Sequence, residues 1–237
     1  DLRMIEHLED MKKAGVDSIK IEGRMKSVYY VALVTRAYRK ALDALEGKIS
    51  DAEAAPFIEE LENVSHRESS TGFYYNPAEA NKTVSGATDS RYILAAEIGE
   101  RLTEQEMNEV LQKGAAHEEA VAHELEEMHP AAREARLKDF EMHPDRNPPR
   151  VLPEDGWAMY RVKPLNMIKA GEKIEFVSPD VVSTKAVPSE WSLVDPEEGT
   201  VRDWVCDGHD CVLYTKIPLQ EGALLRIEDP DYVPGRI

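Results

Sequence analysis

The sequence predicts an α+β chain in which two kinds of structure follow one another. Residues 1–64 combine helical patterns with one short strand pattern, whereas residues 91–237 hold a series of short strand patterns separated by turn residues. Within that series, residues 103–143 form a helical interruption. Residues 65–90, with their turn formers and small polar side chains, are expected to link the two parts. We therefore expect a strand-and-helix unit followed by a small all-β barrel that carries a helical insertion.

A short strand is expected at residues 18–22. Ile19 and Ile21 alternate with Lys20 and Glu22, so the apolar pair shares one strand face and the charged pair shares the other. In a parallel α/β fold, ligands bind where a strand gives way to its helix. The candidate site residues at this end are Lys20, Glu22, Arg24 and Lys26. An edge strand with one solvated, charged face is an equally favoured alternative.

A helix is expected to follow this strand. Gly23 permits a sharp exit from the strand, and Ser27 is a suitable N-cap for a helix that runs to about Glu46. Gly47 is suited to end that helix. Its apolar face is expected to consist of Val31, Val34, Tyr38, Leu42 and Leu45.

Two features are expected between residues 51 and 75. Asp51 is suited to cap a short helix through Glu62. Its solvent side would carry Glu53, Glu59 and Glu60. In the segment that follows, His66 is suited to act as an acid, a base or a ligand, and Arg67 to hold an anion. From the residues alone, a loop whose aromatic side chains dock it onto the fold is the favoured interpretation.

Alternating patterns predict seven strands in the second part of the chain. They cover residues 92–99, 157–163, 172–177, 181–187, 201–205, 211–217 and 223–228. Glycines at several connections are typical of tight turns. The strands are expected to form a closed or nearly closed small barrel.

The insertion at residues 103–143 is expected to contain two helices separated by a proline. Thr103 and Glu106 form a capping-box pattern at its start. The insertion is rich in histidine, but His117 and His123 are six residues apart, whereas ligands on one helix face need spacings of three, four or seven. No metal site is expected, and a solvated acidic helix is the favoured interpretation.

The chain has two cysteines, Cys206 and Cys211, on either side of a turn-like sequence that contains His209. Two thiols and one histidine are one ligand short of a zinc site and lack a standard spacing. A disulfide across the turn is not expected to persist in a reducing cytoplasm. Incidental thiols near a turn are therefore the favoured interpretation.

Charge is distributed unevenly along the chain. The formal net charge is −17, yet residues 1–48 carry 10 Lys and Arg against 8 Asp and Glu, a balance of +2 that leaves −19 for the rest. Such acidity disfavours non-specific nucleic-acid binding by the C-terminal part, although solubility is the simpler explanation for it. Apolar runs of membrane-spanning length and signal-peptide patterns are absent from the sequence, so a cytoplasmic location without membrane partners is expected.

The first residue is Asp rather than Met, which favours a fragment of a longer protein over a processed N-terminus. A helix, a strand and a helix at residues 1–47 cannot bury both faces of a parallel strand. Partner strands are therefore expected from residues upstream of this chain.

Several runs of the chain resemble one known family. The run SIKIEGRMKSVYYVALVTRAYRKALD closely resembles the end of the catalytic region of the collagenase-like peptidases, family thirty-two of the peptidases of unknown mechanism. DLRMIEHLEDMKKAGVD is similar to the segment before it, and SHRESSTGFYYN is similar to a later segment of that family. The spacing from Trp157 to Asp229 resembles the family's C-terminal extension. About Glu104 to Pro149 is not covered.

This resemblance implies that residues 1–64 are the C-terminal end of a (βα)8-type catalytic barrel. It also implies that residues 91–237 form a barrel similar to the second domain of translation GTPases. The implied activity of the parent protein is peptidase activity or oxygen-independent RNA hydroxylation that makes 5-hydroxyuridine at the tRNA wobble position. We favour hydroxylation because the chain shows no protease constellation of residues.

The resemblance also implies roles for the candidate residues. The catalytic candidates are Glu22 and His66, and the substrate-binding candidates are Lys20, Arg24, Lys26 and Arg67. Lys20 and Arg24 would bind an anionic group of the substrate. Glu22 would either orient these two side chains or act as an acid or base. An iron–sulfur cluster is expected only on upstream cysteines, so no cofactor is expected in this chain. The expected partners are tRNA or a protein, and the chain alone is expected to be inert or to serve as a binding module.

Overall fold

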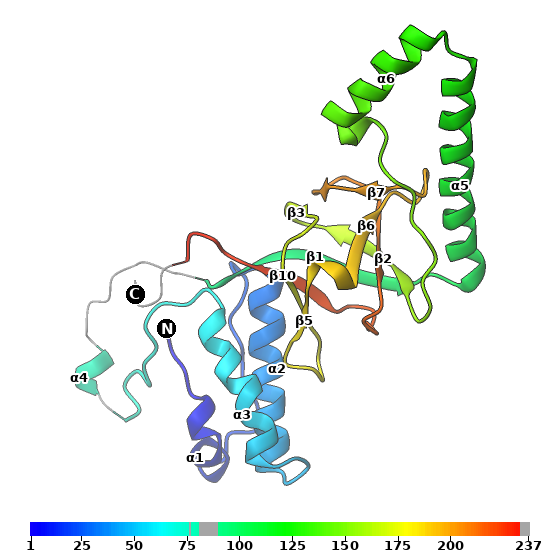
Figure 1. The fold of residues 1–237 in the computed structure, drawn as a ribbon. Coiled ribbons are helices and arrows are strands. Elements are labelled where there is room, and N and C mark those ends of the chain that lie inside the picture. Colours follow the sequence, from blue (N-terminus) through cyan, green and yellow to red (C-terminus); the bar gives the residue numbers. More distant parts are fainter. Residues whose placement is uncertain (76, 81–89, 233–237) are drawn as a thin grey trace. The chain divides into compact units, whose positions relative to one another are not determined.

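A computed structural model describes residues 1–75, 77–80 and 90–232 of the chain (Figure 1). The expected linker at residues 65–90 includes residues 76 and 81–89, which lie outside the described residues. The chain divides into two compact units. The first contains Asp1–Ile93 together with Glu228 and the residues after it, and the second contains Leu94–Ile227.

Helices make up the regular structure of the first unit. They are η1 (Ile5–His7), α1 (Leu8–Lys13), α2 (Val28–Leu45), α3 (Asp51–Glu59), η2 (Glu60–Asn63) and α4 (Pro77–Ala80). Helix α2 confirms the predicted helix and its cap, because the Ser27 hydroxyl accepts a hydrogen bond from the Tyr30 N–H at 3.2 Å. Gly47 ends it with a φ of 71°, a conformation that glycine adopts without strain.

The strand predicted at residues 18–22 is wrong for the described chain. These residues form a segment without regular secondary structure, and no described strand lies beside them. Ile19, expected on the apolar face of that strand, is 38% exposed. The alternation of side chains is present, but a strand also needs a neighbour that accepts and donates ladder hydrogen bonds.

The buried face of α2 differs from the predicted one. The described structure buries Tyr29, Leu33, Ala37 and Ala41, which follow the side of α2 that packs against α3. Of the predicted face, Val34 is buried but Val31 is 39% exposed. Periodicity predicts that a helix has an apolar side, whereas the neighbouring helix decides which side is covered.

Two details of the predicted second helix are also wrong. Ser50 rather than Asp51 is the N-cap, and it forms a capping box with Glu53. Glu60, expected on the solvent side, is buried with Arg36, whose Nη2 lies 3.9 Å from the Glu60 Oε2. The partner of Glu60 comes from α2, so the local pattern of α3 could not reveal it.

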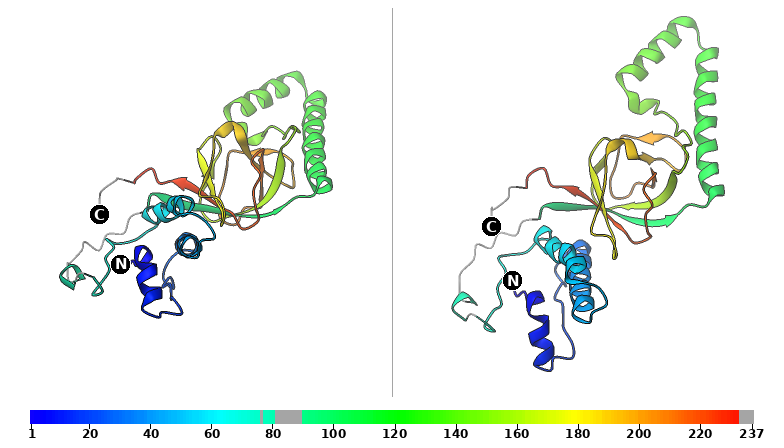
Figure 2. Two further views of the ribbon diagram at one scale, coloured as in Figure 1. Left: turned by 90° about the horizontal axis from the view of Figure 1, so that it is seen from below. Right: turned by 60° about the horizontal axis from the view of Figure 1, so that its bottom comes forward.

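A curled antiparallel sheet dominates the second unit (Figure 2). Its strands are β1 (Tyr92–Arg101), β2 (Ala158–Pro164), β4 (Ile174–Val177), β5 (Thr184–Ala186), β6 (Trp191–Val194), β7 (Val201–Arg202), β9 (Cys211–Thr215) and β10 (Leu224–Glu228), in the order β5-β4-β10-β1-β2-β9-β6-β7. A separate pair joins β3 (Ile168–Lys169) to β8 (Trp204–Val205). The sheet ends at β5 and β7, so of the predicted closed or nearly closed barrel the described strands form a curled sheet that is not closed.

The sequence located most of these strands but not all of them. β3 and β6, which have two and four residues, were not predicted. The pattern at residues 201–205 is divided between β7 and β8, which pair with different partners, β6 and β3. Strand existence is therefore better predicted here than pairing.

Consecutive residues of the strands direct their side chains into two apolar clusters, one on each face of the sheet. Tyr160 of β2 and Leu213 of β9 belong to the cluster enclosed by the curled sheet. Met159 and Val212, one residue away on the same strands, belong to a second cluster that includes Val110 of the helical insertion. The alternation of these strands is explained by the period of two in β structure.

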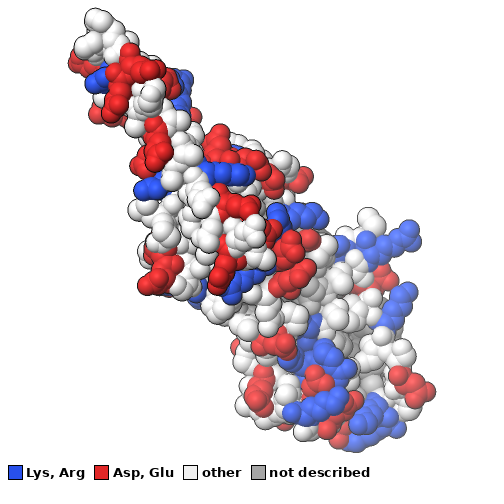
Figure 3. Space-filling view, turned by 90° about the vertical axis from the view of Figure 1, so that its right-hand side faces the viewer, with Lys and Arg blue, Asp and Glu red and all other residues white. Residues whose placement is uncertain are grey.

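The predicted helical insertion lies between β1 and β2. It consists of α5 (Glu104–Glu127), α6 (Pro130–Met142) and the short η3 (Pro144–Arg146). The capping box of Thr103 and Glu106 is confirmed. Acidic side chains are abundant on this insertion in Figure 3, whereas Lys and Arg are more frequent on the helices of the first unit. None of the described helices has the length and apolar content that crossing a membrane requires.

Candidate functional site

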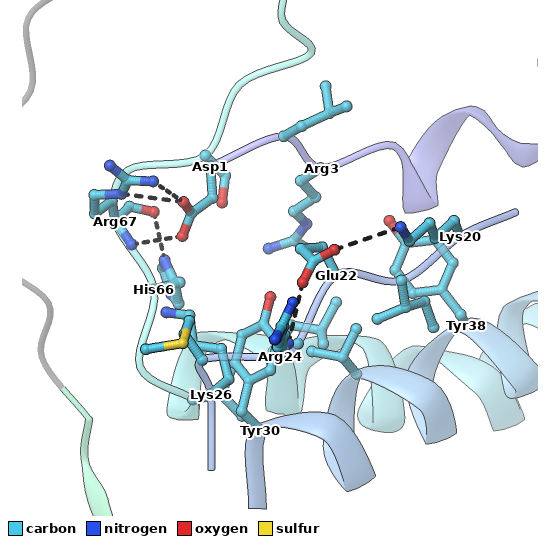
Figure 4. Close-up of a pocket in the computed structure, with 18 of the residues that line it drawn as sticks. Asp1, Arg3, Lys20, Glu22, Arg24, Lys26, Tyr30, Tyr38, His66 and Arg67 are labelled. Atoms are coloured by element: carbon cyan, nitrogen blue, oxygen red, sulfur yellow. Dashed lines mark hydrogen bonds and ion pairs between the residues drawn. The ribbon is translucent and has the colours of Figure 1, made fainter. Parts of the chain in front are cut away.

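A hollow of about 410 Å³ lies on the first unit (Figure 4). It is enclosed by the segment before α2, one side of α2, the first residues of the chain and the segment after η2. All six candidate site residues line it: Lys20, Glu22, Arg24, Lys26, His66 and Arg67. Residues more than forty positions apart in the sequence therefore meet at one pocket.

Glu22 organises one side of this pocket. Its carboxylate accepts a hydrogen bond from the backbone N–H of Arg24 at 3.1 Å and lies 3.8 Å from the Lys20 ammonium. The side chains of Lys20 and Glu22 are 87% and 72% exposed. Such an ion pair is weak in water, so the Lys20 ammonium remains accessible to another anion.

The turn at Gly23 depends on the absence of a side chain. A Cβ atom at this position would lie 2.7 Å from the Val31 Cγ2 of α2. The glycine was predicted to permit a sharp exit from a strand, and the structure assigns it a different role. It lets the charged segment pass close to the first turn of α2.

Lys26 connects the two sides of the pocket. Its ammonium donates a hydrogen bond to the Ser65 carbonyl oxygen at 2.7 Å and lies 4.9 Å from the centre of the Tyr30 ring. The hydrogen bond holds the segment before α2 next to the segment after η2. His66 and Arg67 reach the pocket as a consequence.

The hydrogen bond of His66 to a carbonyl oxygen shows which ring nitrogen carries the hydrogen. Its Nδ1 lies 2.8 Å from the Arg67 carbonyl oxygen, which can only accept, so Nδ1 carries the hydrogen. Its Nε2 lies 3.8 Å from a carboxylate oxygen of Glu62. A neutral His66 therefore presents an unprotonated Nε2, as a proton acceptor requires.

Arg67 is held by a fork of hydrogen bonds. Its Nε and Nη2 donate to one carboxylate oxygen of Asp1 at 3.1 and 2.8 Å, and its backbone N–H donates to the other at 3.0 Å. The side chain is 58% exposed. Arg67 thus has a fixed direction while much of its guanidinium faces solvent.

The side chains that line the pocket carry an excess of positive charge. Five are cationic, namely Arg3, Lys20, Arg24, Lys26 and Arg67, and two are anionic, namely Asp1 and Glu22. The formal balance is 5 − 2 = +3 with His66 neutral. In the part of the chain that is described, the Arg24 guanidinium has no carboxylate partner. The arrangement is suited to bind an anionic group next to a histidine and a carboxylate.

Sequence reasoning missed three contributors to the pocket. Arg3 reaches it from the start of the chain, with its Nη1 2.5 Å from a carboxylate oxygen of Glu62. Tyr30 and Tyr38 line it from α2. The sequence held a signal for Tyr30, because its spacing of eight residues from Tyr38 places both tyrosines on one side of the helix. No local signal marks Arg3.

The residues of this chain do not fit an iron–sulfur cluster. Such clusters are held by several cysteine thiolates, whereas the chain has two cysteines, of which Cys211 is 1% exposed inside the sheet. Among the described residues, no group of three or more His, Cys, Asp or Glu side chains is placed to hold a metal ion.

Comparison with protein families finds a match for the first part of the chain. Residues 1–84 match the model of Peptidase family U32. The resemblance predicted from the sequence is therefore confirmed for the region that forms the pocket.

Several curated relatives match the same length of chain. A tRNA hydroxylation protein P1 of Bacillus subtilis is 42% identical over 78 residues, which are 31% of this chain and 18% of that protein. A tRNA hydroxylation protein P of Escherichia coli is 49% identical over 74 residues, 31% of this chain and 16% of that protein. An uncharacterized protease of Methanocaldococcus jannaschii is 42% identical over 82 residues, 34% of this chain and 20% of that protein. The matched part is at most about a fifth of each of these relatives.

One solved structure is similar in sequence to part of the chain. It is the crystal structure of the C-terminal domain of a candidate U32 peptidase from Geobacillus thermoleovorans. The two chains are 26% identical, and the match covers 33% of this chain and 83% of that one. The TM-score is 0.26.

Proposed function

We propose that this chain, whose residues 1–84 match Peptidase family U32, belongs to a protein that hydroxylates RNA, with tRNA wobble uridine as the substrate base. The observation that carries the proposal is the convergence of all six candidate residues on one cationic pocket. Support for the RNA class comes from two relatives with 42% and 49% identity that are named as tRNA hydroxylation proteins.

In this proposal, Lys20 and Arg24 hold an anionic group of a substrate, either a carboxylate or a phosphate. Both side chains lie at the exposed rim of the pocket, and a guanidinium matches the two oxygens of such a group. Arg67 approaches from the opposite side, fixed by Asp1. Lys26 serves as a structural tie as well as a charge, because its ammonium is hydrogen-bonded to Ser65.

Glu22 and His66 supply the proton-transfer groups. The carboxylate of Glu22 accepts a hydrogen bond from the Arg24 N–H, which holds it at the pocket beside the Lys20 ammonium (Figure 4). His66 presents Nε2 as the acceptor side of its neutral ring. A carboxylate and an imidazole at one pocket provide an acid and a base for the same substrate. Any iron–sulfur chemistry would be supplied by cysteines outside this chain.

Mass spectrometry of tRNA nucleosides tests the proposal. Cells that lack the gene for the whole protein should lose 5-hydroxyuridine derivatives, and restoring the gene should return them. An unchanged nucleoside profile in the deletion strain would contradict the hydroxylation proposal. Complementation with a gene that encodes Glu22→Ala tests the pocket itself, because the protein is then present and only this side chain is missing.

Binding of labelled tRNA to the whole protein at two salt concentrations tests the RNA contact separately. A set of phosphate contacts weakens steeply with salt, because neutralised phosphates release counterions. A salt-independent affinity would argue against Lys20, Arg24 and Arg67 as phosphate ligands. It would leave a carboxylate as the anion that these side chains bind.

Proteolysis is the second candidate function, and one relative is named as an uncharacterized protease. The described contacts of His66 are with the Arg67 carbonyl oxygen and the Glu62 carboxylate, neither of which is a protease nucleophile. Incubation of the purified whole protein with unfolded collagen and casein would detect this activity. If the protein cleaves these substrates and Glu22→Ala loses that activity, the pocket acts on peptides and the hydroxylation proposal is contradicted.

A further inference from the structure

The second unit contains a cysteine and histidine pair that the pocket chemistry does not use. The Cys206 Sγ lies 3.3 Å from the Nδ1 of His209, within hydrogen-bond distance for sulfur. Both residues belong to the turn between β8 and β9, whose glycine Gly208 has a φ of 86°. A thiol and an imidazole at this distance are the components of an activated nucleophile.

The imidazole of His209 is held in place by two residues, Cys206 and Trp204. Its Nδ1 accepts a hydrogen bond from the Cys206 N–H at 3.0 Å and lies 3.1 Å from the Cys206 carbonyl oxygen. The edge of the ring meets Trp204 at a centroid distance of 5.0 Å and an interplanar angle of 89°. An unprotonated Nδ1 can therefore accept a hydrogen bond from the Cys206 N–H, and a protonated Nδ1 can donate one to the Cys206 carbonyl oxygen or sulfur.

The two cysteines of the chain differ sharply in their surroundings. Cys206 is partly exposed, whereas Cys211 is 1% exposed within the core of the sheet. Burial raises the pKa of the Cys211 thiol to about 12, so it stays protonated at neutral pH. Cys211 is thus an internal control for Cys206.

We propose that Cys206 is a nucleophilic thiol, activated by His209, that is oxidised by small hydroperoxides, while Cys211 stays unreactive. His209 takes the thiol proton on Nδ1 and leaves a thiolate. The sulfur attacks one peroxide oxygen, so an S–O bond forms and the O–O bond breaks. The leaving oxygen takes the proton from His209 and departs as water or an alcohol. The sulfur is oxidised by two electrons to a sulfenic acid, and the hydroperoxide is reduced.

The structure also indicates the fate of this sulfenic acid. Cys211 cannot readily attack it, because its thiol is protonated and enclosed by the sheet. A small thiol from solution is therefore the expected partner. Its sulfur forms an S–S bond to Cys206, the S–O bond breaks, and the oxygen leaves as water with the proton of the incoming thiol. The product is a mixed disulfide next to Trp204.

Alkylation by iodoacetamide, followed by peptide mass spectrometry, measures the reactivity of each cysteine in the whole protein. We expect Cys206 to react faster than a cysteine in an unstructured peptide, because the His209 Nδ1 lies 3.3 Å from its sulfur and is placed to take the thiol proton. Cys211 should remain unmodified until the protein is denatured. Equal rates for Cys206 and the peptide would overturn the proposal.

His209→Asn is the decisive variant, because an asparagine oxygen can still accept the Cys206 N–H but cannot take a proton. The proposal predicts that this variant loses the enhanced alkylation and also the dimedone-trapped sulfenic acid formed with hydrogen peroxide. If His209 only shapes the turn, the variant will react as the parent does, which would contradict the proposal. The fluorescence and circular dichroism spectra of the variant verify its fold, and His209→Gln offers a second side chain if the first variant is unfolded.

Discussion

Gly114 of α5 and Gly199 of the turn between β6 and β7 lie against each other without a side chain between them. A Cβ on Gly114 would lie 2.4 Å from the Gly199 carbonyl oxygen, and a Cβ on Gly199 would lie 2.2 Å from the Val110 carbonyl oxygen. Both contacts are with backbone, which cannot turn aside as a flexible side chain can. This contact is where the helical insertion docks on the sheet, next to the packing of Val110 with Met159 and Val212.

Gly114→Ala should therefore destabilise the protein although alanine is the better helix former. Helix propensity favours alanine by about 1 kcal/mol, but the added methyl group forces a backbone shift that costs about 1–3 kcal/mol. We expect a net decrease in the free energy of unfolding, measured by urea denaturation. Gln112→Ala, at an exposed position of the same helix, is the control and should not destabilise. A Gly114→Ala protein more stable than the parent would show that the helix is not held at this point.

The ion pair between Arg226 and Glu175 should contribute much more to stability than a second ion pair of the same carboxylate. Arg226 is 1% exposed with its Nη2 2.7 Å from Glu175, whereas Lys185 is 77% exposed and 3.8 Å away. Arg226→Met leaves a poorly compensated charge inside the unit and should cost about 3–5 kcal/mol. Lys185→Met should cost less than about 1 kcal/mol. Equal losses in chemical denaturation would contradict this difference.

Glu106 should make the stability of the second unit depend on acid pH. Hydrogen bonds from the backbone and hydroxyl of Thr103, with a further contribution from Arg161, lower the pKa of Glu106 from its ordinary value of 4.5. Because the folded state has the lower pKa, this stabilisation is complete above 4.5 and is lost as the pH falls through the lowered value.

Thermal unfolding at several pH values tests this assignment. Glu106→Gln should lower the Tm at pH 7, and the difference from the parent should shrink as the pH approaches 3. Glu104→Gln, two residues earlier in the same first turn, is the control for loss of an acidic side chain near the helix start. A difference in Tm that is constant with pH would argue against Glu106 as the titrating group.

Under the proposed function, Glu22→Ala should abolish tRNA hydroxylation by the whole protein without unfolding it. The side chain is 72% exposed and contributes little buried surface, so its loss is expected to change stability by less than about 0.5 kcal/mol. Nucleoside mass spectrometry of the complemented strain measures the activity. Glu9→Ala, an exposed carboxylate of α1 paired with Lys13, is the matched control. A folded Glu22→Ala protein with full activity would eliminate Glu22 as a catalytic residue.

Under the same proposal, Arg24→Ala should weaken the binding of the anionic substrate more than it slows the chemical step. Its guanidinium is exposed at the rim of the pocket and has no described carboxylate partner, so its charge is available to a ligand. We expect a rise of about tenfold or more in the KM for the anionic substrate, as the loss of one charge-assisted hydrogen bond produces. Arg39→Ala, an exposed arginine of α2 bound to Asp43, is the control. An unchanged KM would place the anion elsewhere.

The candidate site shows what local patterns could and could not provide. The alternation of Lys20 and Glu22 placed them on one side, and their 3.8 Å separation agrees with that. The turn composition around His66 and Arg67 suggested chemistry but no location. The contact between Lys26 and Ser65, which brings the two segments together, joins residues 39 positions apart and has no local signature.

The sequence by itself determined where α2 begins and ends and where α5 begins, since the caps Ser27, Gly47 and Thr103 act on the backbone within a few residues. It also located most strands and the insertion, because periodicity is a property of each segment. Tertiary structure decided which strands pair, that no described strand pairs with residues 18–22, which face of α2 is buried, and that Glu60 lies beside Arg36. Those outcomes depend on contacts between segments distant in the chain, and the free energy of such contacts cannot be read from either segment alone.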